Sequence, residues 1–179
     1  MVQALGFSPS TPDLDWLGRV DPATVRVARL DARIVAASRV APCGHWFGGR
    51  AVPMGAVGPV AVAPDVRGRG VGQALMAHAL VEMRAAGTPL ATLYPSTQPV
   101  YRRVGYEQAG VRLTYRAPLA GLARIRGPGV VRPMTDADRP AVRALSDALA
   151  TERDGCLRRT EHFWRRALDP LKPPPYRYV

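Results

Sequence analysis

One stretch constrains this chain more than any other. Residues 60–76 read VAVAPDVRGRGVGQALM, an apolar run that passes through a glycine-rich turn and opens into a helical pattern. Apolar residues then recur at every fourth position, at Val71, Leu75, Ala79 and Met83. Gly87 follows as a stop signal. The stretch therefore predicts a buried strand, a tight turn and an amphipathic helix over 71–86.

The start of that helix is suited to holding an anion. The first backbone amides of a helix have no partner within it, and the helix dipole places partial positive charge there. Glycines within residues 68–73 leave room for a pyrophosphate, and Arg67 and Arg69 add guanidinium donors. The spacing also admits a simpler interpretation, a glycine-rich turn with a structural role alone.

Two better-known phosphate motifs do not fit this turn. The stretch lacks the Gly-Lys-Ser/Thr ending of a P-loop, which makes nucleotide triphosphate hydrolysis a poor interpretation. Gln73 stands where the dinucleotide fingerprint has its third glycine, and no strand–helix–strand repeat precedes it.

The surrounding sequence predicts a mixed sheet flanked by helices. Cys43–Arg50 is predicted to be a glycine-rich loop, and the charge-free run that follows it a strand buried on both faces. The predicted strands cover 24–29, 34–40, 54–63, 90–94 and 106–116, and the helices 71–86 and 98–104. The fold class is therefore α/β.

A change in composition divides the chain. Residues 116–128 carry prolines and glycines without a clear period, which predicts a linker and a boundary near residue 127. The two parts are then 1–127 and 128–179. In the second part, the predicted elements are a strand at 130–132, a helix over 136–150 capped by Thr135, a helix over 161–168, and the start of a strand at 176–179.

Composition excludes some classes of function. The net charge of +11 is compatible with nucleic acid, a membrane surface or an anionic cofactor. Lys172 is the only lysine, and the arginines are scattered without the aromatic and basic interleaving of RNA-binding modules, so a nucleic-acid binder ranks last. No apolar run approaches a membrane span and no secretory start is present, so we expect a cytoplasmic protein without a membrane partner. Cys43 and Cys156 lack metal-site spacing, and no metal is expected.

The glycine-rich stretch resembles a known motif. Arg67-x-x-Gly70-x-Gly72, preceded by Val-Ala-Val, is similar to the coenzyme A motif of the GNAT superfamily of N-acetyltransferases. Residues 46–54 (WFGGRAVPM), 93–96 (LYPS) and 101–107 (YRRVGYE) resemble its enhanced intracellular survival type. Arg158 and the segments 163–166 and 176–179 resemble the first part of that type's second GNAT-like unit. The likeness covers residues 20–179 and implies a GNAT fold followed by the start of a second such unit.

The resemblance also implies a site. Contacts to acetyl-coenzyme A fall on Val60, Ala61, Val62, Gly68, Arg69, Gly70, Val71, Gly72, Gln73, Ser96 and Thr97. Tyr101 matches the family tyrosine that protonates the departing thiolate, a role suited to a phenol with a pKa near 10. The implied reaction is direct transfer of an acetyl group to a primary amine, such as an aminoglycoside or a lysine side chain. A non-catalytic module that binds acetyl-coenzyme A is the alternative.

Members of that family are longer than this chain. Their C-terminal carboxylate is thought to act as general base, so a chain that ends at Val179 is expected to be a truncated form without that base. Asp65, Glu82 and Glu107 are the acids near the motif, and none is assigned as base. The full-length architecture implies a homo-oligomer. An acidic pocket would suit a polycationic acceptor, but acids are few.

Overall fold

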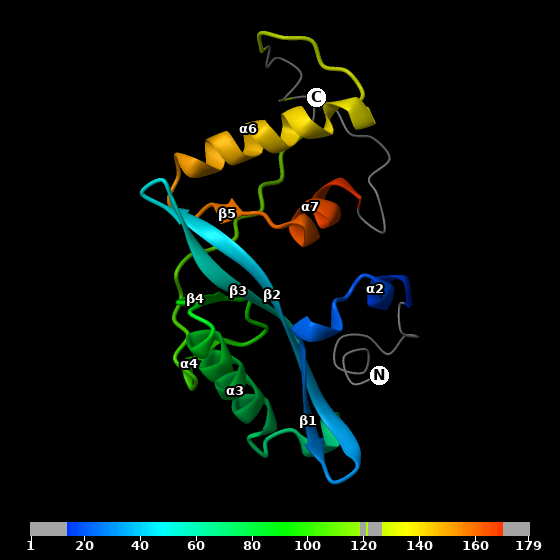
Figure 1. Cartoon of the computed structure of the whole chain (residues 1–179), viewed down its shortest axis with the longest axis vertical. Helices are drawn as coiled ribbons and strands as arrows, with labels where there is room; N and C mark the ends of the chain where they lie inside the picture. Colours follow the sequence, from blue (N-terminus) through cyan, green and yellow to red (C-terminus); the bar gives the residue numbers. More distant parts are fainter. Residues whose placement is uncertain (1–13, 119–120, 122–126, 170–179) are drawn as a thin grey trace.

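The computed structural model describes residues 14–118, 121 and 127–169 (Figure 1). One mixed sheet organises them, with strands in the order β1-β2-β3-β4 and β5 paired to β2. The strands are β1 (Val25–Leu30), β2 (Arg33–Phe47), β3 (Arg50–Val62), β4 (Leu90–Thr92) and β5 (Leu157–Arg158). The helices are α2 (Leu14–Gly18), η1 (Pro22–Thr24), η2 (Pro64–Val66), α3 (Val71–Ala85), α4 (Gln98–Arg102), η3 (Asp136–Asp138), α6 (Arg139–Thr151) and α7 (Glu161–Leu168). None of these described helices is long and apolar enough to cross a membrane.

The long hairpin of β2 and β3 forms the centre of the sheet. Its turn is Gly48-Gly49, and both residues have positive φ angles, 53° and 73°, which two-residue hairpin turns require. The predicted loop over Cys43–Arg50 is therefore wrong, because β2 continues to Phe47 and β3 starts at Arg50. Residues 43–47 pair with residues 50–54 of β3 across the two-glycine turn, and β5, from residues 157–158, pairs with Gly44 and His45 on the other edge.

A bulge interrupts the hairpin. Ser38 pairs with Val60 and Val40 pairs with Val57, so two residues of β3, Gly58 and Pro59, lie opposite Arg39. A bulge of this kind bends the strand and changes where the following side chains point. Residues 60–62 follow directly after it.

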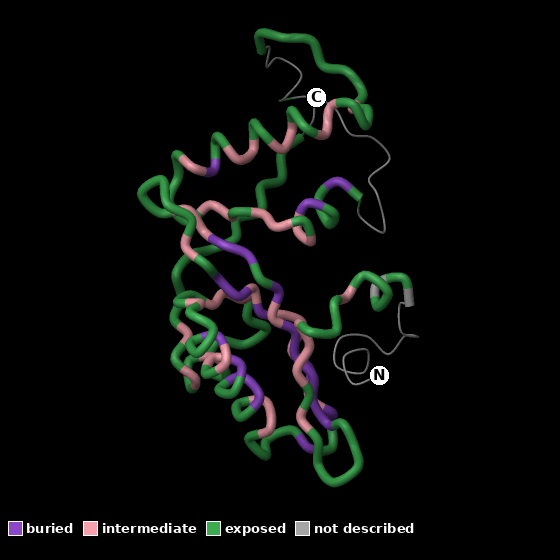
Figure 2. Tube along the Cα trace, in the orientation of Figure 1, coloured by how far each residue is buried: buried purple, intermediate pink, exposed green. Residues whose placement is uncertain are grey.

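Helix α3 covers one face of the sheet, as Figure 1 shows. Of the four periodic positions predicted to face the core, Leu75, Ala79 and Met83 are buried, and Val71 is partly buried. Met76 is buried as well. A side chain at Gly55 of β3 would collide with Met83, so this glycine permits the close approach of helix and strand. Burial in Figure 2 follows the same pattern and concentrates on β2, β3 and the inner side of α3.

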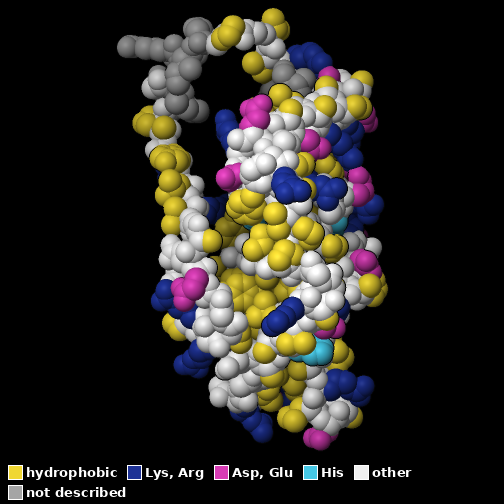
Figure 3. Space-filling view, turned by 60° about the vertical axis from the view of Figure 1, so that its left-hand side comes forward, with side chains coloured by type: hydrophobic (Ala, Val, Ile, Leu, Met, Phe, Trp, Pro, Cys, Tyr) yellow, Lys and Arg dark blue, Asp and Glu magenta, His cyan; other side chains and the backbone are white. Residues whose placement is uncertain are grey.

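Two predicted strands are wrong. Residues 106–116 form no ladder with any described residue, and Val111, Leu113 and Tyr115 along them are 73%, 66% and 85% exposed. Figure 3 shows this segment as a separate run of atoms along one side of the molecule. Residues 130–132 are not a strand either. An alternating pattern makes a strand only where a second strand supplies hydrogen-bond partners.

The later part of the chain joins the same sheet through β5. Helix α7 spans the predicted 161–168, and α6 with η3 covers the predicted 136–150. Thr135 stands at the N-cap of η3, where the carboxylate of Asp138 accepts a hydrogen bond from the Thr135 amide at 2.7 Å. The domain boundary at 127 stays a prediction, and the predicted strand at 176–179 lies outside the described residues.

Candidate active site

The glycine-rich turn joins the end of β3 to the start of α3. Gly68 and Gly70 have φ angles of 78° and 79°, a region that side chains rarely tolerate. Gly70 is the N-cap of α3, and its carbonyl accepts the first helical hydrogen bond from Ala74 at 2.9 Å. The next three amides, of residues 71–73, have no partner within the helix. Within the described part of the chain, no hydrogen bond engages the amides of residues 68–70 either.

The turn lies directly against the strand. A side-chain carbon at Gly72 would stand 3.1 Å from a methyl carbon of Val62, so the helix start contacts the end of β3. Arg67 Nε donates a hydrogen bond to the Val62 carbonyl at 3.1 Å, which leaves the outer guanidinium nitrogens without a partner among the described residues. The structure therefore brings together the predicted strand residues 60–62 and the predicted turn residues 68–73.

One edge of β3 is open beside this turn. Strand β4 pairs only with Met54, Gly55 and Ala56, while the other edge of β3 pairs with β2 up to Val62. At residues 60–62, no described strand pairs with the outer edge of β3, and Arg67 Nε donates a hydrogen bond to the carbonyl of Val62. Backbone donors and acceptors of alternate residues therefore remain available to a ligand that lies along the edge.

Tyr101 lies in α4 and packs against the same region. It belongs to an apolar cluster that also contains Val60 of β3 and Met76 of α3. Its ring meets the edge of Tyr106, with centroids 6.2 Å apart and planes at 77°. Burial raises the pKa of Tyr101, so its phenol is protonated at neutral pH. Burial, followed by the charge of Tyr101, raises the pKa of Tyr106 to about 12.

Ser96 and Thr97 differ from the other predicted site residues. Both are exposed in the loop before α4, and Thr97 occupies the N-cap position of that helix without a side-chain capping bond. Within the described residues, no hydrogen bond connects their side chains to the glycine-rich turn. Their predicted contact with a ligand stays a prediction.

The three acids near the motif are all engaged in ion pairs. Asp65 accepts two hydrogen bonds from Arg33, at 2.6 and 2.8 Å. These hydrogen bonds are the main cause of the lowered pKa of Asp65. Glu82 pairs with Arg26 at 2.5 Å and Glu107 with Arg102 at 2.7 Å. Each of these carboxylates is engaged by an arginine, and we assign none of the three as general base.

Cys43 is a poor nucleophile. The residue is buried in β2, and burial raises the pKa of its thiol to about 11. The thiolate is the reactive form of cysteine, and it is scarce at neutral pH when the pKa is this high.

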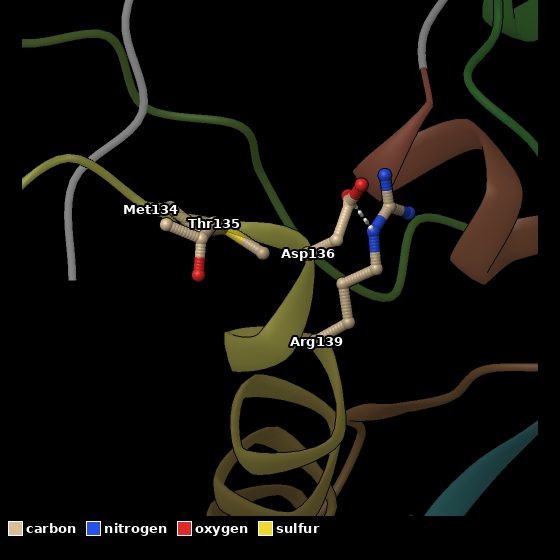
Figure 4. Close-up of a pocket in the computed structure, with 4 residues that line it drawn as sticks. All are labelled: Met134, Thr135, Asp136 and Arg139. Carbon is tan, nitrogen blue, oxygen red and sulfur yellow. Dashed lines mark hydrogen bonds and ion pairs between the residues drawn. The ribbon is translucent and has the colours of Figure 1, made fainter.

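A hollow elsewhere in the described part of the chain is lined by none of the predicted catalytic or binding residues. It lies at the start of α6 and is lined by Met134, Thr135, Asp136 and Arg139 (Figure 4). Asp136 and Arg139 pair with each other at 2.7 Å, and Arg139 also pairs with Asp169. These pairs stabilise the helix start, and none of the residues predicted for the site lines this hollow.

Sequence reasoning missed one charged group inside the fold. Arg39 of β2 is buried, and its Nη2 atom lies 3.0 Å from Nε2 of His162 in α7. The available signal was a single arginine within the otherwise uncharged run 34–49. Its partner, 123 positions further along the chain, could not be found from local sequence.

Comparison with known proteins identifies the family. The protein-family model for the acetyltransferase (GNAT) domain matches residues 2–109, more than half of the chain. The chain belongs to the GNAT acetyltransferase family. The mixed sheet with flanking helices is therefore the GNAT fold, as the sequence motif implies.

Relatives of this GNAT chain are longer than it is. An uncharacterized N-acetyltransferase of Streptomyces griseus is 32% identical over 127 residues, which cover 66% of this chain and 30% of that protein. GCN5-related N-acetyltransferases from Anabaena variabilis and Kribbella flavida are 26% and 28% identical, with TM-scores of 0.86 and 0.79. Both comparisons cover 99% of this chain, but only 46% and 47% of those chains. Eis1 from Mycobacterium abscessus, 22% identical with a TM-score of 0.69, shares the fold over 99% of this chain and 46% of its own.

Proposed function

We propose that this GNAT chain binds acetyl-coenzyme A and transfers the acetyl group directly to a primary amine. One observation carries the proposal: at residues 60–62 the outer edge of β3 has no described strand partner, and it ends beside a helix start whose first amides have no partner within the helix. The extended pantetheine arm of coenzyme A, which contains amide groups, can bond to the strand edge while the pyrophosphate binds the helix start.

The glycine turn fits a pyrophosphate sterically as well as electrostatically. Gly68 and Gly70 have no heavy atom within 4 Å of the point where a side chain would begin, so the space over their amides is open. Arg69 is exposed next to them, and Arg67 keeps two guanidinium nitrogens free. The donor-binding residues would be Val60, Ala61, Val62, Gly68, Arg69, Gly70, Val71, Gly72 and Gln73, with Ser96 and Thr97 from the following loop.

The transfer needs a group that stabilises the oxyanion and a group that protonates the departing sulfur. The amine nitrogen forms a bond to the thioester carbonyl carbon, and a backbone amide of residues 60–62 stabilises the charge that develops on the carbonyl oxygen. As the carbon–sulfur bond breaks, Tyr101 gives its phenolic proton to the sulfur. The raised pKa of Tyr101 supports this role, because the proton is present at neutral pH. The proton of the amine leaves to water, since the nearby acids are engaged in ion pairs.

We further infer that the chain is of the enhanced intracellular survival type. The segments 46–54, 93–96 and 101–107 support this relationship, and the shared fold of Eis1 is compatible with it. That type acetylates amines, including aminoglycosides and lysine side chains, so the acceptor class is a primary amine. A non-catalytic module for acetyl-coenzyme A is the second candidate, favoured by the lack of an unpaired acid near the motif.

Calorimetric titration of acetyl-coenzyme A tests the donor site. We expect micromolar binding by the chain and loss of most of that binding when Arg67 and Arg69 are both changed to alanine. Arg29→Ala with Arg84→Ala is the matched control, because it removes the same charge from exposed positions. Equal affinity of the two double variants would contradict the site.

Substitution of Tyr101 separates the two candidate functions. In Tyr101→Phe, the rate of acetyl transfer should fall about 10²- to 10⁴-fold while the affinity for acetyl-coenzyme A stays unchanged. Tyr115→Phe is the control, since Tyr115 is 85% exposed away from the cluster. A transfer rate that does not change in Tyr101→Phe would remove Tyr101 as the acid.

A further inference from the structure

A buried hydroxyl without a partner lies beside Tyr101. The Oη atom of Tyr106 is fully buried, and it forms no hydrogen bond with a described residue. Three buried side-chain atoms of the described residues share this state, and Tyr106 is the one among them whose ring contacts Tyr101. An unpaired buried hydroxyl costs free energy, so its presence next to the proposed acid needs a physical reason.

The backbone holds the two tyrosines against each other. After α4, the Tyr106 amide donates a hydrogen bond to the Tyr101 carbonyl at 3.2 Å. The Gly105 amide donates another to the Arg102 carbonyl at 3.0 Å, and Gly105 has a φ angle of 94°. These features define a Schellman motif, which commonly brings the two side chains at its ends into contact. The rings of Tyr101 and Tyr106, with centroids 6.2 Å apart, form that contact.

The two phenol oxygens differ in access. Tyr101 Oη also forms no hydrogen bond with a described residue, but it is not among the fully buried atoms. A ligand can therefore reach Tyr101 Oη from the surface, as the transfer of a proton to the substrate requires. Tyr106 Oη is closed to solvent, so its partner must come from the groups packed around it.

The groups packed around both rings are otherwise apolar. Elements β2, β3, β4 and α3 contribute side chains that cannot ionise, and the cluster contains Val40, Val57, Val60, Met76, Leu80, Met83, Ala91, Leu93 and Val104. The nearest charged residues in the chain are exposed: Arg102 pairs with Glu107, and Arg103 lies beside them. Within this cluster, the side-chain oxygen available to Tyr106 is that of Tyr101.

The charge of one phenol also reaches the other. Burial, followed by the charge of Tyr101, raises the pKa of Tyr106 to about 12. Tyr101 therefore ionises first, and Tyr106 keeps the proton that makes it a hydrogen-bond donor. Burial raises the pKa of Tyr101 as well, so negative charge on its oxygen is unfavourable unless a donor faces it.

Resting on the proposed function, we propose that Tyr106 is a positioning residue for Tyr101. As the proton of Tyr101 passes to the sulfur, its oxygen gains negative charge, and the Tyr106 hydroxyl donates a hydrogen bond to that oxygen. Tyr106 keeps its own proton throughout, and Tyr101 regains a proton from water before the next turnover. The hydroxyl is unpaired at rest because the charge that it stabilises exists only during the reaction.

Titration of the tyrosines tests this hydrogen bond without acetyl-coenzyme A. The chain is labelled with carbon-13 at the tyrosine carbon that bears the oxygen, and NMR follows ionisation, with Tyr101→Phe and Tyr106→Phe to assign the signals. Because Tyr106→Phe removes a donor to the phenolate of Tyr101, we expect the pKa of Tyr101 to rise by about one pH unit. Tyr115→Phe, at a position 85% exposed, should leave it unchanged. An unchanged or lower pKa of Tyr101 in Tyr106→Phe would overturn the inference.

Thermal melting tests whether the hydroxyl is unpaired in the resting chain. Tyr106→Phe keeps the ring contact with Tyr101 and removes only an unpaired buried hydroxyl, so the melting temperature should stay the same or rise. A melting temperature several degrees lower would show that the hydroxyl is already bonded at rest, which contradicts the inference.

Kinetics of acetyl transfer to the aminoglycoside tobramycin measure the effect on the reaction. Tyr106→Phe should lower kcat by about 10- to 100-fold with KM for acetyl-coenzyme A unchanged, and move the alkaline fall of kcat to higher pH. In a Tyr101→Phe background, the same substitution should have no further effect, because Tyr106 acts through Tyr101. Losses that multiply in the double variant would exclude this role.

The two measurements separate this inference from the proposed function. A rate that falls in Tyr101→Phe but not in Tyr106→Phe would leave the proposed function intact and overturn the inference. A raised pKa of Tyr101 in Tyr106→Phe, in a chain whose transfer rate does not depend on Tyr101, would retain the hydrogen bond and refute the acid role of Tyr101.

Discussion

Strand β3 and the segment 106–116 both have sequences that favour a strand, yet only β3 is one. β3 pairs with β2 along most of its length and with β4 at Met54–Ala56, and α3 covers it. In the other segment, Val111, Leu113 and Tyr115 alternate as strand residues should, but no described strand pairs with them. The difference shows that an apolar pattern alone is not enough to form a strand. The segment becomes a strand only when another strand supplies hydrogen-bond partners for its backbone.

The largest expected contrast comes from deleting side chains in the two regions. Met76→Ala, which empties a site under α3 that is 1% exposed, should lower the free energy of unfolding by about 2–5 kcal/mol. Leu113→Ala, at a position 66% exposed, should change it by less than about 0.5 kcal/mol. Urea denaturation measures both. Similar losses in the two variants would mean that segment 106–116 is packed in solution.

A smaller contrast comes from adding one carbon to a glycine. In Gly55→Ala the new methyl group would meet Met83 and stand 2.8 Å from a methyl carbon of Val40, so we expect a loss of about 1–3 kcal/mol. Gly110→Ala has nothing within 4 Å and should be neutral within about 0.5 kcal/mol. Thermal melting of the two variants compares them directly. A neutral Gly55→Ala would show that α3 lies further from β3 than described.

The smallest contrast concerns ion pairs. Glu82 joins α3 to Arg26 of β1 and is partly buried, whereas Glu107 pairs with Arg102 at an exposed position. Glu82→Gln should lower the free energy of unfolding by up to about 1 kcal/mol. Glu107→Gln should lower it by less than about 0.5 kcal/mol, and this smaller loss should disappear in high salt. Denaturation at two salt concentrations is the measurement. A larger loss for Glu107 would indicate that its pair orders the start of the segment.

Helices were predicted better than strands, and the reason is local. The period of α3 and the boundaries of α7 follow from residues three and four positions apart, which contact each other within one helix. The loop predicted over 43–50 failed because its glycines were assigned to a loop, whereas Gly48-Gly49 is a two-residue hairpin turn between paired strands, and because Gly44 and His45 also pair with β5, which comes from residues 157–158. No window of local sequence contains that partner.

Some features of the candidate site could likewise be predicted from local sequence, and others could not. The glycine-rich turn could be recognised because strand, turn and helix start are continuous in the chain, so their spacing is written in the sequence. The proximity of Tyr101 to Val60 was inferred only through resemblance, and the apolar cluster now gives it a physical basis. Arg39 and His162 could not be connected, since a single charged residue in a strand does not reveal its neighbour.

The sequence by itself determined the strand–turn–helix unit, the amphipathic faces of its helices and, through its motif, the family. These features depend on backbone preferences and on contacts between residues close in the chain. The tertiary structure decided which alternating segments became strands, which acids were held by arginines, and that a buried arginine faces an imidazole from a distant helix. Those outcomes depend on which groups meet when the chain folds, because a backbone hydrogen bond or a buried charge is satisfied only by a partner in space.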